Sequence, residues 1–439
     1  MPTPTPVLHR DGLIAAFFDY VHPREQWRVG VELERHLLRP DGTPLPYFGE
    51  NGVRSIIETM APNGWKPYFE GENPIALFRG GASVTLEPGS QYEFSGSPWV
   101  NIADVESEAR AFVHELDEAI GDRPICPVAL GYTPVAAIDD IAWVPKSRYA
   151  VMRDYLAETG HLAHHMMKGT CATQASYDFS SEADCAEKVR LGILISPLIT
   201  AIFANSPLTG GEPNGWASFR GHIWTQTDPR RCGFPEAAEK FTFERWVDYL
   251  LDVPMMFTQG PQGFAPAHGR SFRSWMLEGN EGVWPDMADW DLHMTSVFPE
   301  VRVKKFIEIR GADCVSHELA VAFSALFKAL LYDDQARSEA TELAVGFASH
   351  GTSAARFEVA CREGLAGQHG GRRLASWAED LVNIAANGLD RLNDQERRWI
   401  APLIQQVASG ESPGTGNLRR WVASNDRSQQ VQALRYTAP

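Results

Sequence analysis

Residues 83–98 carry the run Ser83-Val84-Thr85-Leu86-Glu87-Pro88-Gly89-Ser90-Gln91-Tyr92-Glu93-Phe94-Ser95-Gly96-Ser97-Pro98. It places Gln91 and Glu93 two residues apart in a segment typical of a strand, so both side chains are expected on one face. Acidic groups on a sheet face resist burial unless water or a cation neutralises them. The stretch therefore predicts a sheet that presents carboxylates to a divalent metal ion.

Two further segments repeat this pattern. Val29-Gly30-Val31-Glu32-Leu33-Glu34 alternates apolar and acidic residues, and Phe306-Ile307-Glu308-Ile309-Arg310 sets a carboxylate and a guanidinium on one face. Oxygen ligands spread over several strands suit Mg²⁺, which proteins hold with a few carboxylates together with substrate phosphates. Any single pair is more often the solvated face of an amphipathic strand. Three pairs together favour a metal site and nucleotide chemistry.

The composition favours one large body. The 439 residues are 44% hydrophobic, and length alone corresponds to about three domains. We find no linker, repeat or low-complexity tract, so we expect a single domain over residues 1–439, mainly helical from about residue 315. The formal charge of -16 argues against a nucleic-acid binder, which needs a basic surface.

The first residues, Met1-Pro2-Thr3-Pro4-Thr5-Pro6, lack the basic and apolar regions of a signal peptide, and the apolar run at 13–18 is too short to cross a bilayer. We therefore expect a cytoplasmic protein without a membrane partner. The six cysteines show no CxxC or Cys/His spacing, so reduced thiols are expected. They are Cys126, Cys171, Cys185, Cys232, Cys314 and Cys361.

Two elements near residue 180 are also predicted. Ser181 and Asp184 have capping-box spacing, and the following residues to Phe203 are apolar nearly all round, which indicates a buried helix. Before this cap, polar and apolar residues alternate from Gln174 to Phe179, as in a strand. Gln174 is therefore expected on the polar face.

The chain contains an ordered series of runs between about residues 28 and 333 that resembles the glutamate-cysteine ligases of plants and proteobacteria. These belong to the carboxylate-amine ligase superfamily, which includes glutamine synthetase. The runs are Gly30-Val31-Glu32-Leu33-Glu34, Glu70-Gly71-Glu72-Asn73, residues 81–98, Pro145-Lys146-Ser147-Arg148-Tyr149, residues 178–184, Ala204-Asn205-Ser206-Pro207, Pro213-Asn214-Gly215, Arg220-Gly221-His222-Ile223-Trp224, Phe298-Pro299-Glu300-Val301-Arg302 and residues 308–313.

The resemblance implies an α+β fold in which a curved, mainly antiparallel sheet forms a cup-shaped active site with helices packed outside. It also implies an ATP- and Mg²⁺-dependent ligase, a monomer or homodimer whose partners are small molecules. Such an enzyme converts the γ-carboxylate of glutamate to an acyl phosphate that the amine of cysteine attacks, giving γ-glutamylcysteine for glutathione synthesis. No Walker loop or Rossmann fingerprint is present, so metal, Lys and Arg would hold the phosphates.

The resemblance further assigns metal ligands and a catalytic arginine. Arg310 would stabilise the charge that grows on the transferring phosphoryl group. A structural ion pair with Glu308 is the alternative for this arginine. The implied metal ligands are Glu32, Glu34, Glu87, Glu93, Gln174 and Glu308.

Four residues are expected to bind substrates. Arg220 matches the family arginine that clamps the α-carboxylate of the donor glutamate, for which a guanidinium fork is suited. Lys146 and Arg148 are candidate cations for phosphates or carboxylates, with solvated surface groups as the alternative. Trp224 would pack beside substrate, although buried aromatic residues more often belong to the core.

The chain also departs from typical members of the family it resembles. Gly169 stands where they carry Arg, and Ser176 stands where they carry Asn; both lie close in sequence to Gln174, which predicts an altered substrate pocket. Three functions therefore remain open at this stage. The protein is a glutamate-cysteine ligase, a divergent relative that couples a similar acid to another amine, or an inactive regulator that binds a metabolite.

Overall fold

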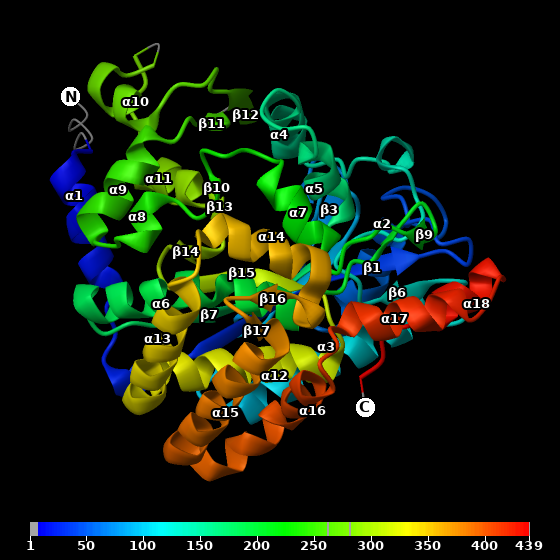
Figure 1. The fold of residues 1–439 in the computed structure, drawn as a ribbon. Coiled ribbons are helices and arrows are strands. Elements are labelled where there is room, and N and C mark those ends of the chain that lie inside the picture. Colours follow the sequence, from blue (N-terminus) through cyan, green and yellow to red (C-terminus); the bar gives the residue numbers. More distant parts are fainter. Residues whose placement is uncertain (1–7, 261–262, 281, 439) are drawn as a thin grey trace.

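The computed structural model describes residues 8–260, 263–280 and 282–438, so the predictions made from residues 1–6 lie outside the described residues. The described chain contains a nine-stranded sheet in the order β14-β15-β7-β1-β5-β4-β3-β2, with β6 paired to β1 (Figure 1). Every pairing in this sheet is antiparallel, which confirms the predicted fold class. Its strands are β1 (Val29–Leu38), β2 (Lys66–Glu70), β3 (Asn73–Arg79), β4 (Ala82–Leu86), β5 (Tyr92–Ser95), β6 (Cys126–Val128), β7 (Ala172–Tyr177), β14 (Val301–Val303) and β15 (Ile307–Asp313).

Helices make up most of the remaining chain, together with four small strand pairs. The helices are α1 (Arg10–Ala16), α2 (Val53–Met60), α3 (Ile102–Ile120), α4 (Ser147–Ala157), α5 (Ala163–Gly169), α6 (Glu182–Ile202), α7 (Phe219–Thr225), α8 (Glu236–Glu239), α9 (Phe243–Asp252), α10 (Phe272–Glu278), α11 (Met287–Met294), α12 (His317–Tyr332), α13 (Asp334–Ala348), α14 (Ser353–Glu363), α15 (Leu374–Asn393), α16 (Ala401–Ser409), α17 (Pro413–Val422) and α18 (Arg427–Gln432). The pairs are β8 (Leu208–Thr209) with β9 (Glu212–Pro213), β10 (Cys232–Gly233) with β13 (Phe298–Pro299), β11 (Phe257–Gly260) with β12 (Gly263–Pro266), and β16 (Gln368–His369) with β17 (Arg372–Arg373).

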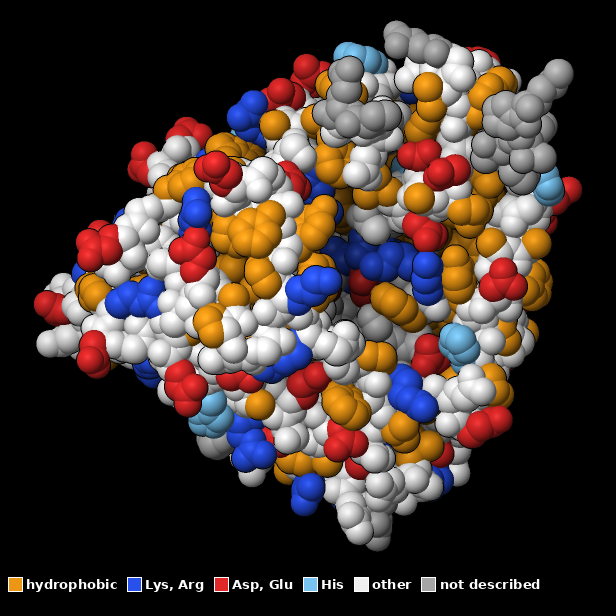
Figure 2. Space-filling model, turned by 180° about the vertical axis from the view of Figure 1, so that it is seen from behind, with side chains coloured by type: hydrophobic (Ala, Val, Ile, Leu, Met, Phe, Trp, Pro, Cys, Tyr) orange, Lys and Arg blue, Asp and Glu red, His pale blue; other side chains and the backbone are white. Residues whose placement is uncertain are grey.

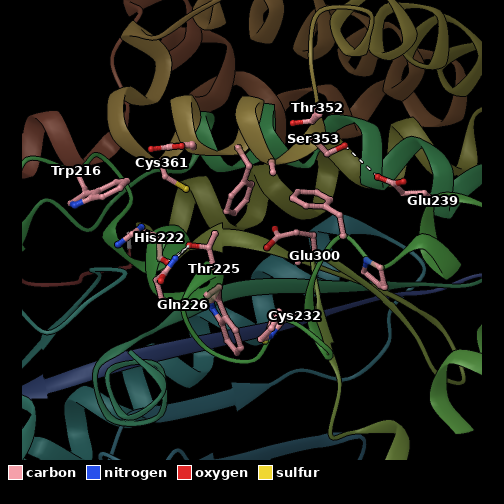
Figure 3. A pocket seen from close by; sticks show the side chains of 18 residues that line it. Trp216, His222, Thr225, Gln226, Cys232, Glu239, Glu300, Thr352, Ser353 and Cys361 are labelled. Atoms are coloured by element: carbon pink, nitrogen blue, oxygen red, sulfur yellow. Dashed lines mark hydrogen bonds between the residues drawn. The ribbon is translucent and has the colours of Figure 1, made fainter. Parts of the chain in front are cut away.

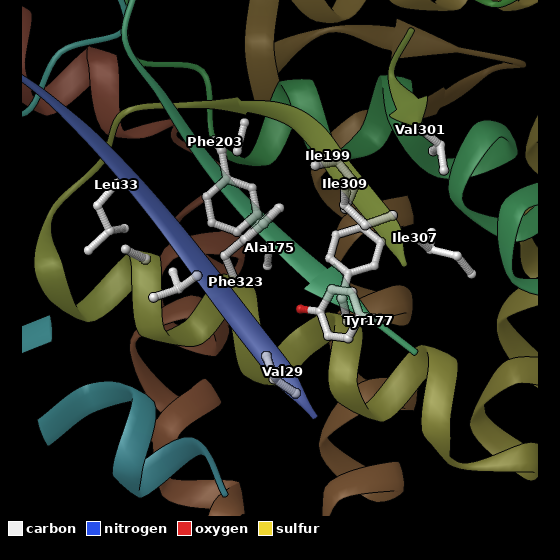
Figure 4. Packing of buried hydrophobic residues seen from close by; sticks show 14 of the residues in the cluster. Val29, Leu33, Ala175, Tyr177, Ile199, Phe203, Val301, Ile307, Ile309 and Phe323 are labelled. Carbon is white, nitrogen blue, oxygen red and sulfur yellow. The ribbon is translucent and has the colours of Figure 1, made fainter. Parts of the chain in front are cut away.

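One face of the sheet packs on the main hydrophobic core. Val29 and Leu33 of β1, Tyr177 of β7 and Ile309 of β15 are buried there, and Phe323 of α12 packs against the same layer (Figure 4). The period-two alternation of the strands sends their polar residues to the opposite face. The apolar half of each predicted strand therefore fixes the orientation of its acidic half.

Helix α6 is the buried helix that the sequence predicts. Its N-cap is Ser181, whose hydroxyl accepts a hydrogen bond from the Asp184 N–H at 3.0 Å. In a capping box the Asp184 carboxylate would accept from the N–H of Ser181. Here it accepts from the N–H of Ser180 instead, at 2.8 Å. The helix is buried along most of its length and lies behind β15, where it covers the sheet.

The polar face of the sheet is enclosed on its sides. Helices α4, α5 and α7 and the β11–β12 hairpin supply side chains to a cavity whose floor is formed by β1, β5, β7 and β15. Figure 2 shows a hollow on this side of the molecule in which basic and acidic side chains gather. The predicted cup is therefore present, with helices forming part of its wall as well as its exterior.

The C-terminal part is mainly helical, from α12 through α18, with β16 and β17 its only strands among the described residues (Figure 1). That this part belongs to one domain with the rest stays a prediction. Among the described residues, the helices are too short or too polar to cross a membrane. All six cysteines are buried free thiols.

Candidate active site

Three carboxylates meet on the polar face of the sheet. Glu32 and Glu34 alternate along β1, and the antiparallel register places Glu34 opposite Glu93 of β5. One oxygen of each of these three residues lies within 4.8 Å of the others. Thr85 Oγ1 donates to Glu93 Oε1 at 2.7 Å, and the Ala172 N–H donates to Glu34 Oε2 at 2.7 Å. These bonds orient two of the three carboxylates within the cluster.

The carboxylates raise one another's pKa. Burial raises the pKa of Glu32 well above its ordinary value, with further increases from Glu93, Glu308 and Glu34. Burial, followed by the charges of Glu87 and Glu93, raises the pKa of Glu34 to about 8, and burial also raises the pKa of Glu93. A divalent cation bound between them would lower these pKa values and stabilise the ionised carboxylates. Oxygen donors in this arrangement fit Mg²⁺.

Gln174 of β7 connects this cluster to Arg310 of β15. The Gln174 side-chain amide donates to Glu32 Oε1, and also to Glu34 Oε1 at 3.1 Å. Its carbonyl oxygen accepts from Arg310 Nη1 at 2.6 Å. The predicted polar orientation of Gln174 is therefore present, and the residue joins two carboxylates and a guanidinium in one network.

Glu308 occupies a different electrostatic environment. Its Oε2 accepts from Arg302 Nε at 2.7 Å and from Arg310 Nη1 at 2.8 Å, while Oε1 lies 3.1 Å from Lys304 Nζ. Burial alone would raise the pKa of Glu308, but Arg302, Lys304 and Arg310 outweigh it and hold that pKa well below the usual range. Both oxygens are thus paired with cations, and the metal-ligand role of Glu308 stays a prediction.

Glu87 enters the cavity from the tight turn between β4 and β5. Gly89 is required in this turn, because a Cβ atom there would lie 2.2 Å from the Lys168 carbonyl oxygen. Gln91 precedes β5 and donates to backbone carbonyl groups near α5, at 2.9 and 3.1 Å. Gln91 therefore anchors the turn and does not project with Glu93, contrary to the expectation from their spacing.

The two predicted cations near α4 have different positions. Arg148 lines the cavity, and its Nε is buried without a hydrogen-bond partner among the described residues. Lys146 lies outside the cavity lining and donates from Nζ to the Leu86 carbonyl oxygen at 2.7 Å. Burial, and then the charge of Arg148, lowers the pKa of Lys146 to about 8. Arg148 is therefore the better placed of the two to meet an anionic substrate.

Helix α7 brings Arg220 and Trp224 to the same cavity, which has a volume of about 340 Å³. Arg220 Nη2 donates to the Arg310 carbonyl oxygen at 2.9 Å, and Nη1 lies 3.8 Å from Asp313 Oδ1. The Trp224 Nε1 is buried without a partner among the described residues. The predicted residues that line this cavity are Glu32, Glu34, Glu87, Glu93, Arg148, Gln174, Arg220, Trp224 and Arg310, whereas Lys146 and Glu308 do not.

A second cavity, of about 820 Å³, lies next to the first and shares Glu32 and Lys304 with it. Arg28 and Lys305 add two further cations to its lining, which also contains the carboxylates of Asp178 and Glu308. Below, the first cavity is called the carboxylate cavity and the second the basic cavity. An anion bound in the basic cavity would reach the carboxylate cluster at Glu32.

Residues 28–433 match the protein family described as Glutamate-cysteine ligase family 2. The chain belongs to this family. It is 34% identical over 431 residues to glutamate-cysteine ligase B, chloroplastic, of Oryza sativa subsp. japonica, covering 97% of this chain and 86% of that protein. It is also 34% identical over 412 residues to the chloroplastic glutamate-cysteine ligase of Nicotiana tabacum, covering 92% of this chain and 78% of that protein.

Solved structures of two bacterial proteins share the fold. The Francisella tularensis glutamate-cysteine ligase in complex with AMP matches with a TM-score of 0.60 at 11% identity, covering 93% of this chain and 87% of that chain. The Pasteurella multocida bifunctional glutathione synthetase matches with a TM-score of 0.54 at 12% identity, covering 97% of this chain and 53% of that chain. The predictions of family, fold and ligase class are confirmed.

The two departures from typical family members do not touch the carboxylate cavity. A Cβ atom at Gly169 would lie 2.4 Å from the Tyr132 ring and 3.0 Å from Ile138, so the space beyond Gly169 is already filled. Ser176 lines the basic cavity instead. Ser176 lies on the same face of β7 as Gln174, and that the two changes alter a substrate pocket stays a prediction.

Arg302 and Lys304 are site residues that the sequence predictions missed. Both line the carboxylate cavity and both pair with Glu308. A signal for Arg302 was available, because Val301 and Val303 flank it in an alternating segment just before β15. An antiparallel hairpin then sets Arg302 directly opposite Glu308.

Proposed function

We propose that this protein is an ATP- and Mg²⁺-dependent ligase that joins the γ-carboxylate of glutamate to the amine of cysteine. The observation that carries the proposal is the carboxylate cavity. It holds three clustered carboxylates beside the guanidinium groups of Arg148, Arg220 and Arg310 in a family whose members are named for this reaction. An amide bond from a free carboxylate needs such a site, because two anionic reactants must be held together while phosphate is transferred.

The carboxylates Glu32, Glu34 and Glu93 would hold Mg²⁺, with Glu87 and Gln174 beside them. Bound there, Mg²⁺ would supply positive charge that offsets the repulsion between phosphate and substrate carboxylate. The mutually raised pKa values of the three carboxylates support this assignment, since a divalent cation stabilises their ionised forms.

The chain's cations have separate proposed roles. Arg220 binds the α-carboxylate of glutamate, for which a guanidinium offers two parallel donors. Arg310 is oriented by Glu308 and Gln174 and stabilises the charge that develops on the transferred phosphoryl group. Arg148, with its unpartnered Nε, contributes to the binding of anionic substrate.

We further propose that the nucleotide enters through the basic cavity. Arg28, Lys304 and Lys305 line it and would meet the phosphates, while Glu32 marks the point where the two cavities join. The terminal phosphate would then reach the glutamate held in the carboxylate cavity. Under this arrangement nucleotide and amino acid approach from different sides of the carboxylate cluster.

An assay with purified protein tests the proposal. The protein is incubated with ATP, Mg²⁺ and glutamate, with cysteine or a panel of other amines, and ADP and product mass are followed. We expect γ-glutamylcysteine as the main product. Neither Gly169 nor Ser176 lines the carboxylate cavity, so these two departures do not argue against cysteine as acceptor there.

The other outcomes are distinct. ADP formed with another amine, at least about tenfold more efficiently than with cysteine, would identify a divergent ligase. Binding of ATP and glutamate without ADP release under any condition would identify an inactive regulator. Either result would replace the proposal.

A further inference from the structure

A third cavity lies outside the carboxylate cavity, between α7, the β10–β13 pair and α14 (Figure 3). Its volume is about 570 Å³, which is within the range of small-molecule sites in proteins. Trp224 of α7 lines both this cavity and the carboxylate cavity, so the indole is a shared wall. We call this space the aromatic cavity.

The walls of the aromatic cavity are rich in aromatic rings. Trp216 stacks on His222 with ring centroids 4.0 Å apart, and Phe234 meets Phe357 edge-on at 5.4 Å. The Arg362 guanidinium also lies over the Trp216 ring, 4.0 Å from its centroid, so Trp216 is already in contact with a cation, while Trp224, Phe234 and Phe357 line the space. Aromatic faces carry partial negative charge and attract organic cations.

Glu300 is the polar group at the centre of this cavity. It is 6% exposed and lies among the lining side chains in Figure 3; its Oε2 has no hydrogen-bond partner among the described residues and faces Gly311 of β15, where a Cβ atom would lie 2.7 Å from it. Burial raises the pKa of Glu300 to about 7, and the charges of Arg220 and Arg310 offset this only in part. Arg220 lies closer to Asp313, at 3.8 Å, and Arg310 pairs with Glu308, at 2.8 Å.

The charge of the remaining lining has the same sign. Glu239 and Glu358 lie at exposed positions of the lining; Glu358 is paired with Arg362, whose Nε lies 3.7 Å from its Oε1, and no Lys or Arg belongs to the lining itself among the described residues. A buried carboxylate without a partner is costly, and a hydrogen-bonding cation is its best partner. An anionic ligand would be repelled by the carboxylates, and a neutral apolar ligand would leave Glu300 unpaired.

We propose that the aromatic cavity is a binding site for an organic cation, a primary ammonium group carried on an apolar body. The ammonium would donate to Glu300, and the apolar body would pack between Trp224, Phe234 and Phe357. This site is separate from the proposed ligase site, and the inference does not depend on which reaction the carboxylate cavity performs.

Direct binding tests this site without any activity measurement. The unmodified protein is titrated with 2-phenylethylamine, and with 2-phenylethanol as its neutral analogue, by calorimetry and by tryptophan fluorescence. We expect the amine to bind at least about tenfold more tightly than the alcohol, the ratio typical of one charge-assisted hydrogen bond. Glu300→Gln should remove this preference by weakening the amine about tenfold or more.

Two further variants separate the site from general effects. Glu358→Gln removes a carboxylate that is 67% exposed and should change affinity less than about twofold, because a solvated charge contributes little. Ala354→Trp, at an exposed position of the lining, should block the amine while Glu300 stays intact. Melting curves verify that each variant is folded. Equal affinity for amine and alcohol, an unchanged affinity in folded Glu300→Gln, or no amine binding at millimolar concentration would overturn the proposal.

Discussion

Replacing Glu93 by glutamine tests the carboxylate cluster, because it removes one charge and keeps the side chain's shape. Glu93 has an oxygen within 4.8 Å of those of Glu32 and Glu34. Two unit charges at that separation repel by about 3.5 kcal/mol at the effective dielectric constant of a protein site, around 20. Protonation of the cluster reduces this repulsion at low pH, so the effect is largest where the carboxylates ionise.

The pH dependence has a defined sign. Burial raises the pKa of Glu34 from 4.5 to about 8, so the folded state retains a proton that the unfolded chain releases. The contribution of Glu34 to stability therefore falls as pH rises from about 4.5 to about 8. Glu93→Gln removes one neighbouring charge and should make this fall shallower. For 439 residues, 1 kcal/mol corresponds to about 1 °C in melting temperature.

We expect Glu93→Gln without Mg²⁺ to melt about 2 °C or more above the unmodified protein at pH 8. Mg²⁺ should raise the melting temperature of the unmodified protein and have a smaller effect on the variant. Turnover should fall about 10²-fold or more. Differential scanning fluorimetry from pH 5 to 8, with and without Mg²⁺, and initial-rate kinetics provide the measurements.

Glu118→Gln is the matched control, since it removes the same charge from an exposed position of α3. It should leave the melting temperature, its Mg²⁺ response and turnover unchanged. A Glu93→Gln variant that melts below the unmodified protein at pH 8, or that keeps near-normal turnover at limiting Mg²⁺, would refute the reasoning. Glu93 would then be a stabilising group of the fold.

Three further substitutions test individual roles. Arg220→Lys keeps the charge and loses the guanidinium fork, so glutamate binding should weaken by about 1 to 3 kcal/mol, which is measured as a higher KM for glutamate. The KM for ATP should not change. A selective loss of ATP affinity would place Arg220 on the nucleotide side. Arg310→Ala should lower kcat about 10²-fold or more and leave the KM values for ATP and glutamate unchanged. If activity falls only by the fraction of the variant that is unfolded, Arg310 forms a structural ion pair instead. Gly169→Arg should lower the melting temperature, because the new side chain meets Tyr132; an unchanged melting temperature with an altered amine preference would show that position 169 acts on the acceptor.

The floor of the cup was predictable from local sequence. In β1, Val29, Val31 and Leu33 are buried on one face of the sheet, so Glu32 and Glu34 lie on the other face. The same alternation fixes Gln174 in β7 and Arg310 in β15. Period-two patterning needs no knowledge of the neighbouring strands, and for this reason these positions follow from the sequence alone.

Other features depend on contacts between distant segments and could not be predicted. Gln91 has strand-like spacing from Glu93, yet its amide bonds to carbonyl groups near residue 168, about 80 positions away in the chain. The filled space beyond Gly169 depends on Tyr132, which no local pattern connects to it. Glu300 was included only as part of a family run, and its unpartnered oxygen is visible only in the folded protein.

Glu308 pairs with three cations on the floor of the cup, close to the carboxylate cluster. Arg302, Lys304 and Arg310 converge on this one carboxylate, so their combined charge exceeds it by two. The excess positive charge lies next to Glu32, where the carboxylate cavity and the basic cavity meet. Because the cations are fixed before any ligand arrives, little reorganisation is needed when negative charge develops there. In the proposed reaction, Glu308 would therefore act by positioning the cations, while Glu32, Glu34 and Glu93 hold the metal.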